Sequence, residues 1–166
     1  MKYMKLTAAQ RQEMWASLAG MPAFLRETFA MLDADEARVA GPAGAFSPVE
    51  QVWHLADLET AGFGERIRRL LREDAPRLPD FDGAQVARQR DYRSLSLSAG
   101  LAAFQAARLD NIAALQSLSA EDWSRSGTQE GVGAVSLCDI PEFICQHDLA
   151  HQAEIEQWRQ SAGDAA

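Results

Sequence analysis

The stretch SPVEQVWHLADL, residues 47–58, decides the fold of this chain. It opens with a strong helix-start signal. Ser47 suits the N-cap, Pro48 occupies the first helical position, and a glutamate at the third position can reach back to the cap. Apolar residues then recur at helical spacing to about Arg72, and His54 lies in the middle of this run. The stretch therefore predicts a long helix with one buried face and a histidine among its apolar residues.

The same apolar spacing predicts three further long helices. They should span about residues 8–34, residues 98–118, and a last segment that begins near residue 136 or 139 and frays from residue 161; a short helix is expected at about residues 84–92. Pro22 lies inside the first of them. Because proline removes a backbone hydrogen bond and clashes with the preceding turn, we expect a kink or a break there. The pattern predicts an all-α fold, a four-helix bundle with long connections, and the length predicts a single domain over residues 1–166.

The composition opposes several classes of function. The chain has 166 residues, 47% of them hydrophobic, and a formal charge of -8. Nucleic acids and anionic membranes require clustered Lys and Arg, which so acidic a chain does not favour. No apolar run approaches the roughly 18 residues of a spanning helix, and no signal peptide is evident. We expect a soluble, cytoplasmic protein with neither nucleic-acid nor membrane partners, in which Cys138 and Cys145 are small buried thiols.

The three histidines of the chain are the candidate metal ligands. His147 and His151 are spaced i, i+4, so on a helix their rings lie on one face at a separation that one metal ion can bridge. His54 lies in the apolar part of another helix. Three imidazoles would leave coordination positions open, as in catalytic zinc sites. Spacing alone leaves a second interpretation equally open, in which His54 is a core histidine and the other two are a surface pair.

Several segments carry a resemblance to the DinB/YfiT-like family of metal-binding proteins. WHLADLE at residues 53–59 is similar to the second helix of that family, and HDLAH at residues 147–151 is similar to the HDxxH of its fourth helix. The similarity extends to the proline-interrupted first helix and to residues 78–82, 104–108 and 122–123. The resemblance implies an up-down-down-up four-helix bundle with one divalent transition metal on His54, His147 and His151.

The resemblance also sets the expected function. Zinc or nickel is favoured, with iron or manganese as alternatives, and the partner is a small-molecule substrate such as a low-molecular-weight thiol. A metal-dependent transferase of the thiol-transferase type is the first hypothesis, because a metal keeps a bound thiolate deprotonated. A metal-dependent hydrolase is the second. The third is a non-catalytic, stress-related metal-binding or interaction protein. Family resemblance and wide apolar helix faces suggest a homodimer.

Carboxylates near the histidines are candidates for supporting roles. Glu154 departs from the neutral amide of many relatives and follows His151 by three residues, so it is predicted to be a fourth ligand, an acceptor for a ligand N–H, or a catalytic base; the alternative is a surface residue. Asp57 is expected to orient the ring of His54, and Asp148 is expected on a flank of its helix. The open position should face a pocket lined by some of these residues: Trp53, Asp57, Phe104, Arg108 and Glu154. The arginines at positions 66, 68, 69 and 72 are interpreted as a solvated face rather than as a substrate site.

Overall fold

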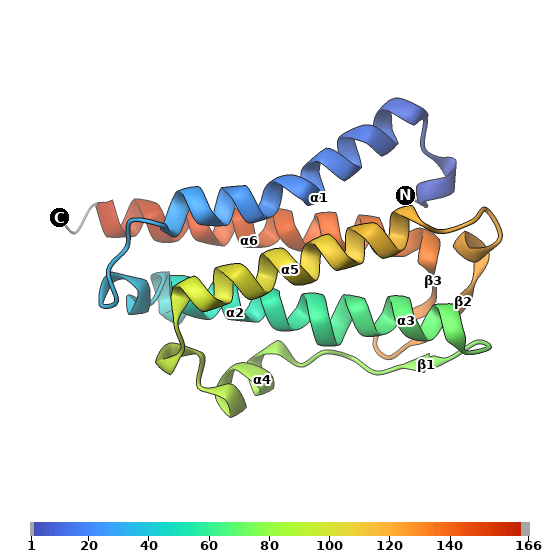
Figure 1. The fold of residues 1–166 in the computed structure, drawn as a ribbon. Helices are drawn as coiled ribbons and strands as arrows, with labels where there is room; N and C mark the ends of the chain where they lie inside the picture. Colours follow the sequence, from blue (N-terminus) through green and yellow to red (C-terminus); the bar gives the residue numbers. More distant parts are fainter. Residues whose placement is uncertain (1, 164–166) are drawn as a thin grey trace.

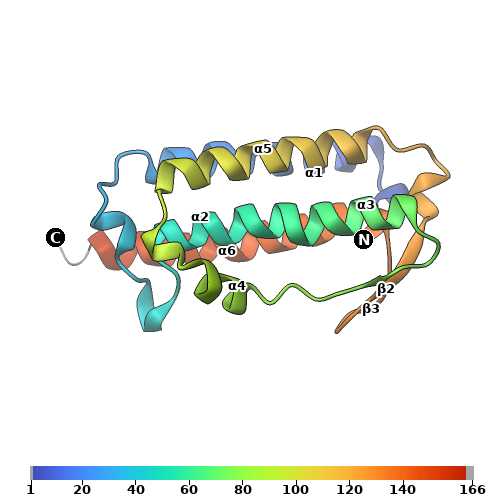
Figure 2. The same cartoon turned by 60° about the horizontal axis from the view of Figure 1, so that its bottom comes forward.

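The structure is a computed structural model that describes residues 2–163. Its four-helix bundle is built from α1 (Ala8–Phe29), the continuous helix α2 (Pro48–Asp57) and α3 (Glu65–Arg72), α5 (Leu97–Gln116), and α6 (Ile140–Gly163). Helices α2–α3 and α5 run in one direction, and α1 and α6 run in the other, which confirms the up-down-down-up order (Figure 1). Figure 2 shows α1 and α5 in one layer and α2–α3 with α6 in the other. Within the described residues, no helix combines the length and apolar character that a membrane crossing requires.

Helix boundaries follow the signals in the sequence, with one difference. The predicted capping box at Ser47 is present: its backbone N–H and its hydroxyl both donate to Glu50 Oε2, at 2.9 and 2.6 Å. Helix α1, expected to reach residue 34, ends at Phe29. The reason is a local turn, because Asp33 Oδ1 accepts hydrogen bonds from the backbone N–H groups of Asp35 and Glu36, at 2.8 and 2.9 Å.

The proline inside α1 bends the helix without breaking it. Figure 1 shows α1 changing direction along its length, while helical structure continues from Ala8 to Phe29. Pro22 has no N–H to donate to the carbonyl of Leu18, the residue one turn earlier. Arg108 of α5 donates to that carbonyl instead, through Nη1 at 3.0 Å. A side chain from a neighbouring helix thus satisfies the backbone group that proline leaves free.

The long helix of α2 and α3 is interrupted by a π-helical segment, Leu58–Gly64. Such a segment inserts a residue into the α-helical repeat and often lies at a functional site. Asn111 Nδ2 reaches across from α5 and donates to both the backbone carbonyl and Oε2 of Glu59, at 2.8 and 2.7 Å. These bonds fix the segment against α5.

A small sheet closes one end of the bundle, and the all-α prediction did not include it. Strand β1 (Arg77–Leu78) pairs in parallel with β2 (Ser126–Gln129), which pairs antiparallel with β3 (Gly133–Ser136). The β2–β3 turn needs glycine at Gly131 and Gly133, where φ is positive. The short helix α4 (Gly83–Arg90) lies in the connection between β1 and α5. These strands are too short and polar to give a periodic signal.

The core consists of two apolar clusters with a polar layer between them. One cluster includes Leu18, Phe63, Ile67, Leu70, Ile112, Leu115, Ile140 and Ile144. The other includes Met21, Leu25, Phe29, Val52, Leu55, Phe104, Ile155 and Trp158. Between these sets, α2–α3, α5 and α6 carry buried polar residues, among them Glu59, Arg108, Asp148 and His151. Buried polar groups require partners, so this layer holds the structure's most specific interactions.

Candidate metal centre

The three histidines converge on one another from two helices. His54 comes from α2, and His147 and His151 come from α6. Nε2 of His147 lies 3.4 Å from Nε2 of His54 and 3.1 Å from Nε2 of His151, and the candidate ligand atoms of all three lie within 4.8 Å of one another. The expected clustering of the three rings is therefore present, and the interpretation as an isolated core histidine plus an unrelated surface pair is wrong.

The geometry and charge of this cluster fit a divalent transition metal. Ligands about 2.0–2.1 Å from a tetrahedral ion lie about 3.3–3.4 Å apart, close to the two Nε2–Nε2 distances here. Burial lowers the pKa of His54 to about 4 and that of His147 to about 3, and the neighbouring histidines add to both shifts. Burial also lowers the pKa of His151. The imidazoles are therefore neutral near pH 7, which is the form that binds metal.

A hydrogen-bonded chain orients His151. Its Nδ1 lies 2.6 Å from Gln51 Oε1, and Gln51 Nε2 donates to Glu154 Oε2 at 2.8 Å. Glu154 Oε2 is also 3.3 Å from His151 Nδ1. With Nδ1–H donating to these oxygens, the lone pair of Nε2 faces the other histidines. Of the roles considered for Glu154, this placement fits an acceptor for the ligand N–H, on the edge of the ring opposite Nε2.

His54 is held by close packing rather than by the expected carboxylate. Its Nδ1 is buried and, within the described residues, has no hydrogen-bond partner. A Cβ placed on Gly83 would lie 2.4 Å from His54 Cε1 and 2.7 Å from Nδ1, so only glycine fits there. The prediction for Asp57 was wrong: its carboxylate accepts from the Tyr92 hydroxyl at 2.6 Å and pairs with Arg90. Those bonds hold the end of α4 and the residues that follow it against α2.

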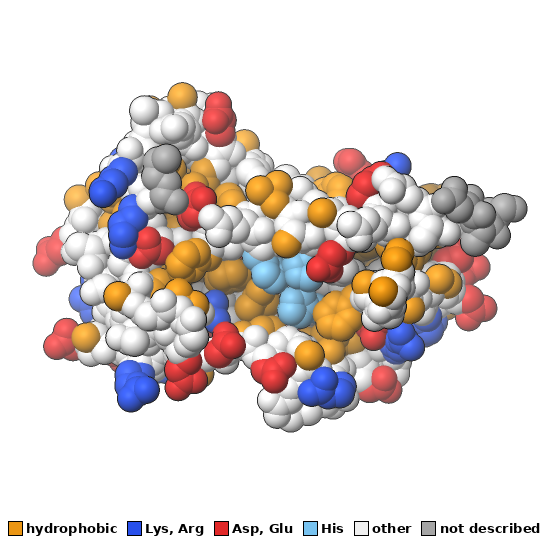
Figure 3. All heavy atoms as spheres, turned by 180° about the vertical axis from the view of Figure 1, so that it is seen from behind, with side chains coloured by type: hydrophobic (Ala, Val, Ile, Leu, Met, Phe, Trp, Pro, Cys, Tyr) orange, Lys and Arg blue, Asp and Glu red, His pale blue; other side chains and the backbone are white. Residues whose placement is uncertain are grey.

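The histidines open onto a pocket of about 280 Å³, but on a different wall from the one expected. Figure 3 shows the histidine side chains on the floor of a hollow bordered by hydrophobic side chains. The pocket is lined by His54, Leu58, Phe63, Arg66, Asp80, Phe81, Gln129, Val132, Phe143 and His147. Phe104 and Arg108, predicted to line it, are fully buried elsewhere in the core. The sheet and the β1–α4 connection supply much of the wall, and the predicted lining considered only the helices.

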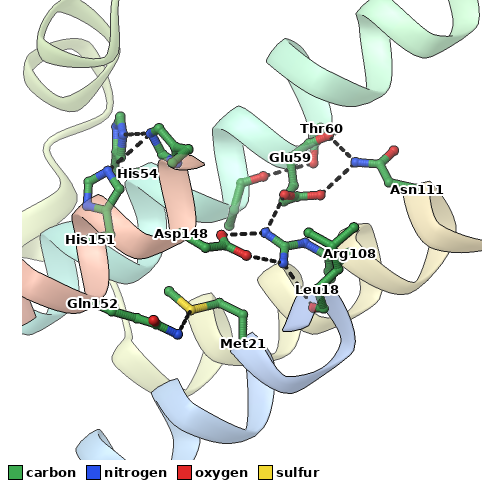
Figure 4. A network of polar contacts seen from close by, with 12 residues as sticks. Leu18, Met21, His54, Glu59, Thr60, Arg108, Asn111, Asp148, His151 and Gln152 are labelled. Carbon is green, nitrogen blue, oxygen red and sulfur yellow. Dashed lines mark hydrogen bonds and ion pairs between the residues drawn. The ribbon is translucent and has the colours of Figure 1, made fainter. Parts of the chain in front are cut away.

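A buried ion network lies behind the histidines (Figure 4). Arg108 donates to both oxygens of Asp148, at 2.6 and 2.8 Å, and to Glu59 Oε1 at 2.7 Å. Asp148 is only 3% exposed, so its predicted place on a helix flank was wrong. Burial opposes the charge of Arg108, yet the bond to Asp148 and the charge of Glu59 raise its pKa. The aspartate of the HDxxH motif thus anchors α6 to α5 and to the π-helical segment.

Four residues that matter to this centre escaped the sequence analysis in different ways. Gln51, Gly83 and Gln129 are common polar or small residues with no distinguishing spacing. Arg66 was grouped with a solvated face. That interpretation holds for Arg68 and Arg69, which pair with Glu65 and Glu73 at 2.5 and 2.7 Å, but Arg66 is buried in the pocket.

Fold and site together define a class: a four-helix bundle that presents a cluster of three neutral imidazoles to an open pocket. The sequence model of the DinB superfamily matches residues 10–155, so the chain belongs to that superfamily. It is 25% identical over 157 residues to a Geobacillus kaustophilus protein named "Putative metal-dependent hydrolase", covering 94% of this chain and 88% of the relative.

Two solved structures are similar in fold. YfiT from Bacillus subtilis, described as "a probable metal-dependent hydrolase with an unusual four-helix bundle topology", has a TM-score of 0.85 at 19% identity, covering 96% of this chain and 91% of YfiT. The mycothiol-dependent maleylpyruvate isomerase has a TM-score of 0.72 at 12% identity, covering 93% of this chain and 63% of the isomerase. At these identities the likeness concerns the fold. The chain matches about two thirds of the isomerase's length.

Proposed function

We propose that this protein is a metal-dependent enzyme of the thiol-transferase type, with His54, His147 and His151 as the metal ligands. The observation that carries the proposal is the convergence of three neutral imidazoles beside an open pocket. A structural ion is usually enclosed by four protein ligands. Within the described residues, this cluster has three, and two of them reach the pocket wall.

The chain's own residues prepare the site for such chemistry. Gln51 and Glu154 orient His151, Gly83 allows the ring of His54 its position, and the Arg108 network fixes α6 behind both. A divalent ion held there would supply Lewis acidity and keep a bound thiol deprotonated near neutral pH. Phe63, Phe81 and Phe143 provide apolar walls that limit the access of water. Zinc and nickel are the favoured ions, and iron and manganese are the alternatives.

Hydrolysis is the second candidate, and a pocket carboxylate favours it. Asp80 lines the same cavity as His54 and His147, where it could accept a proton from attacking water. The names of two similar proteins also point to this reaction. Glu154, the base considered from the sequence, lies against Nδ1 of His151 instead, and we propose it as a positioning residue.

Loading the purified protein with zinc or nickel and measuring two reactions separates these candidates. One is conjugation of 1-chloro-2,4-dinitrobenzene with cysteine or glutathione, and the other is hydrolysis of 4-nitrophenyl acetate. Thiol transfer predicts metal-dependent conjugation that is lost in His147→Ala. Ester hydrolysis without conjugation would favour the second candidate, and particularly so if Asp80→Asn removes it. Metal binding with neither reaction would favour the non-catalytic, stress-related alternative. A cytoplasmic location and a homodimer belong to the same proposal.

A further inference from the structure

Arg66 is a buried cation without an anion. It lies on α3, is 7% exposed, and lines the pocket together with His54 and His147. Within the described residues its guanidinium forms no hydrogen bond and no ion pair, and its Cζ lies 5.6 Å from the ring centroid of Phe63. Buried charges are normally paired, because desolvation is costly. The structure therefore leaves the planar donor group of Arg66 available to a ligand.

Two further polar groups surround the same space. Gln129 of β2 is 6% exposed, and its Oε1 is buried without a hydrogen-bond partner. The Asp80 carboxylate faces Arg66 closely enough to influence it electrostatically, yet the two side chains form no ion pair. The charge of Arg66 also acts on His147, so the cation lies near the histidine cluster. An acidic chain with a formal charge of -8 has thus placed an unpaired cation beside its candidate metal centre.

We propose that Arg66 holds the carboxylate of a small organic acid, so that the substrate is an anion bound between α3 and the histidine cluster. Guanidinium and carboxylate match in a bidentate geometry, which Asp80 does not attain in this structure. Gln129 Oε1 accepts from a hydroxyl or N–H group of the same molecule. The cavity of about 280 Å³ suits a small acid or the acidic end of a larger thiol. This inference rests on the proposed function and names its substrate class.

Cobalt(II)-loaded protein tests the proposal, because its visible spectrum reports a thiol that enters the coordination sphere. The probes are mercaptoacetate, 3-mercaptopropionate and 4-mercaptobutyrate, each compared with the mercapto-alcohol of equal carbon number. The pair isolates the carboxylate, and the series varies its distance from sulfur. At the best length we expect the acid to bind about 10- to 100-fold more tightly than the alcohol, the size of one charge-assisted contact. Equal affinities at every length would overturn the proposal.

Three variants assign the effect to the pocket. Arg66→Gln should remove the preference for the acid, so that the acid and the alcohol bind this variant with similar affinities. Arg68→Gln is the matched control, because it removes the same charge from an exposed side chain two residues along the helix. This variant should keep the preference for the acid. Asp80→Asn should tighten binding of the acid alone, because a competing carboxylate is removed. Circular dichroism checks the fold of each. A preference that survives in Arg66→Gln, or that Arg68→Gln also removes, contradicts the assignment.

Thiol transfer and the carboxylate site can be refuted separately. If no thiol of either kind changes the cobalt spectrum, the thiol-transferase proposal fails. Calorimetry with glutarate on zinc-loaded protein then decides the anion site by itself. Binding that weakens at least about tenfold in Arg66→Gln supports the carboxylate site. No binding, or equal binding in the two proteins, refutes it.

Discussion

Replacing Arg108 by methionine should strongly destabilise the protein. The substitution keeps a long side chain but removes the cation that bonds Asp148, Glu59 and the carbonyl of Leu18. Breaking a buried ion pair costs about 3–5 kcal/mol, and a carbonyl left unsatisfied adds about 1 kcal/mol or more. We expect a loss of about 5 kcal/mol at pH 7.5, a large part of the stability of an ordinary domain.

The pH dependence of this loss is diagnostic. Burial raises the pKa of Asp148, and Arg108 opposes that shift. Without Arg108 the carboxyl titrates higher in the folded than in the unfolded state, so the folded variant binds more protons. The contribution of Asp148 to the stability of the variant is therefore fully present below the pKa that this carboxyl has in the unfolded chain. It is lost as the pH rises through the pKa of the carboxyl in the folded variant. The difference in free energy of unfolding between the wild type and Arg108→Met should therefore be smaller at pH 5 than at pH 7.5.

Urea unfolding followed by circular dichroism at both pH values measures the effect. Arg68→Met is the control, because that exposed arginine should contribute less than about 1 kcal/mol. The variant Glu59→Gln/Arg108→Met/Asp148→Asn, in which the whole network is neutral, should recover part of the loss. A loss below about 1 kcal/mol, or an equal loss at both pH values, would refute this account of the polar layer.

Four further predictions address the centre and the assembly. His147→Ala should abolish zinc binding in calorimetry and lower the apo melting temperature only modestly, whereas loss of the cooperative transition would favour a structural ion. Gly83→Ala should weaken zinc binding, because the added Cβ would clash with the ring of His54. Gly20→Ala is the control, since its Cβ would have no neighbour within 4 Å, and it should leave zinc affinity unchanged. Equal zinc affinities in the two variants would contradict the packing role of Gly83. Because the pKa values of His54 and His147 are lowered in the folded protein, the unfolded chain binds more protons at acidic pH. The free energy of unfolding of the apo protein should therefore fall between about pH 6.5 and pH 4, by about 3 kcal/mol for His54 alone. Urea midpoints that stay constant over this range would contradict this expectation. Light scattering at micromolar concentration should show a dimer, and a monomer would count against the expected assembly.

The sequence by itself determined where the four long helices lie and which histidines share a helix face. Helical periodicity, the capping box at Ser47 and the i, i+4 spacing of His147 and His151 are local properties of the chain, fixed by backbone geometry. For His54, spacing left two interpretations open, and the family resemblance of residues 53–59 and 147–151 added the expectation that it joins them. Helical spacing can place a residue on a face, but it does not state which other helix that face meets.

The tertiary structure alone decided what surrounds the histidines. Gln51 bonds the ring of His151 from α2, and Gly83 approaches His54 from the start of α4, so neither contact follows from spacing along one helix. The contact of Glu154 with His151 is the exception, because these two residues are spaced i, i+3 on α6. Asp148 illustrates the same limit, because its burial depends on an arginine 40 residues away. The pairing of buried polar groups is set by which elements meet in space. The sequence shows that a charged residue is present at a position. Only the packing of the helices shows whether that charge is solvated, paired with another residue or available to a ligand.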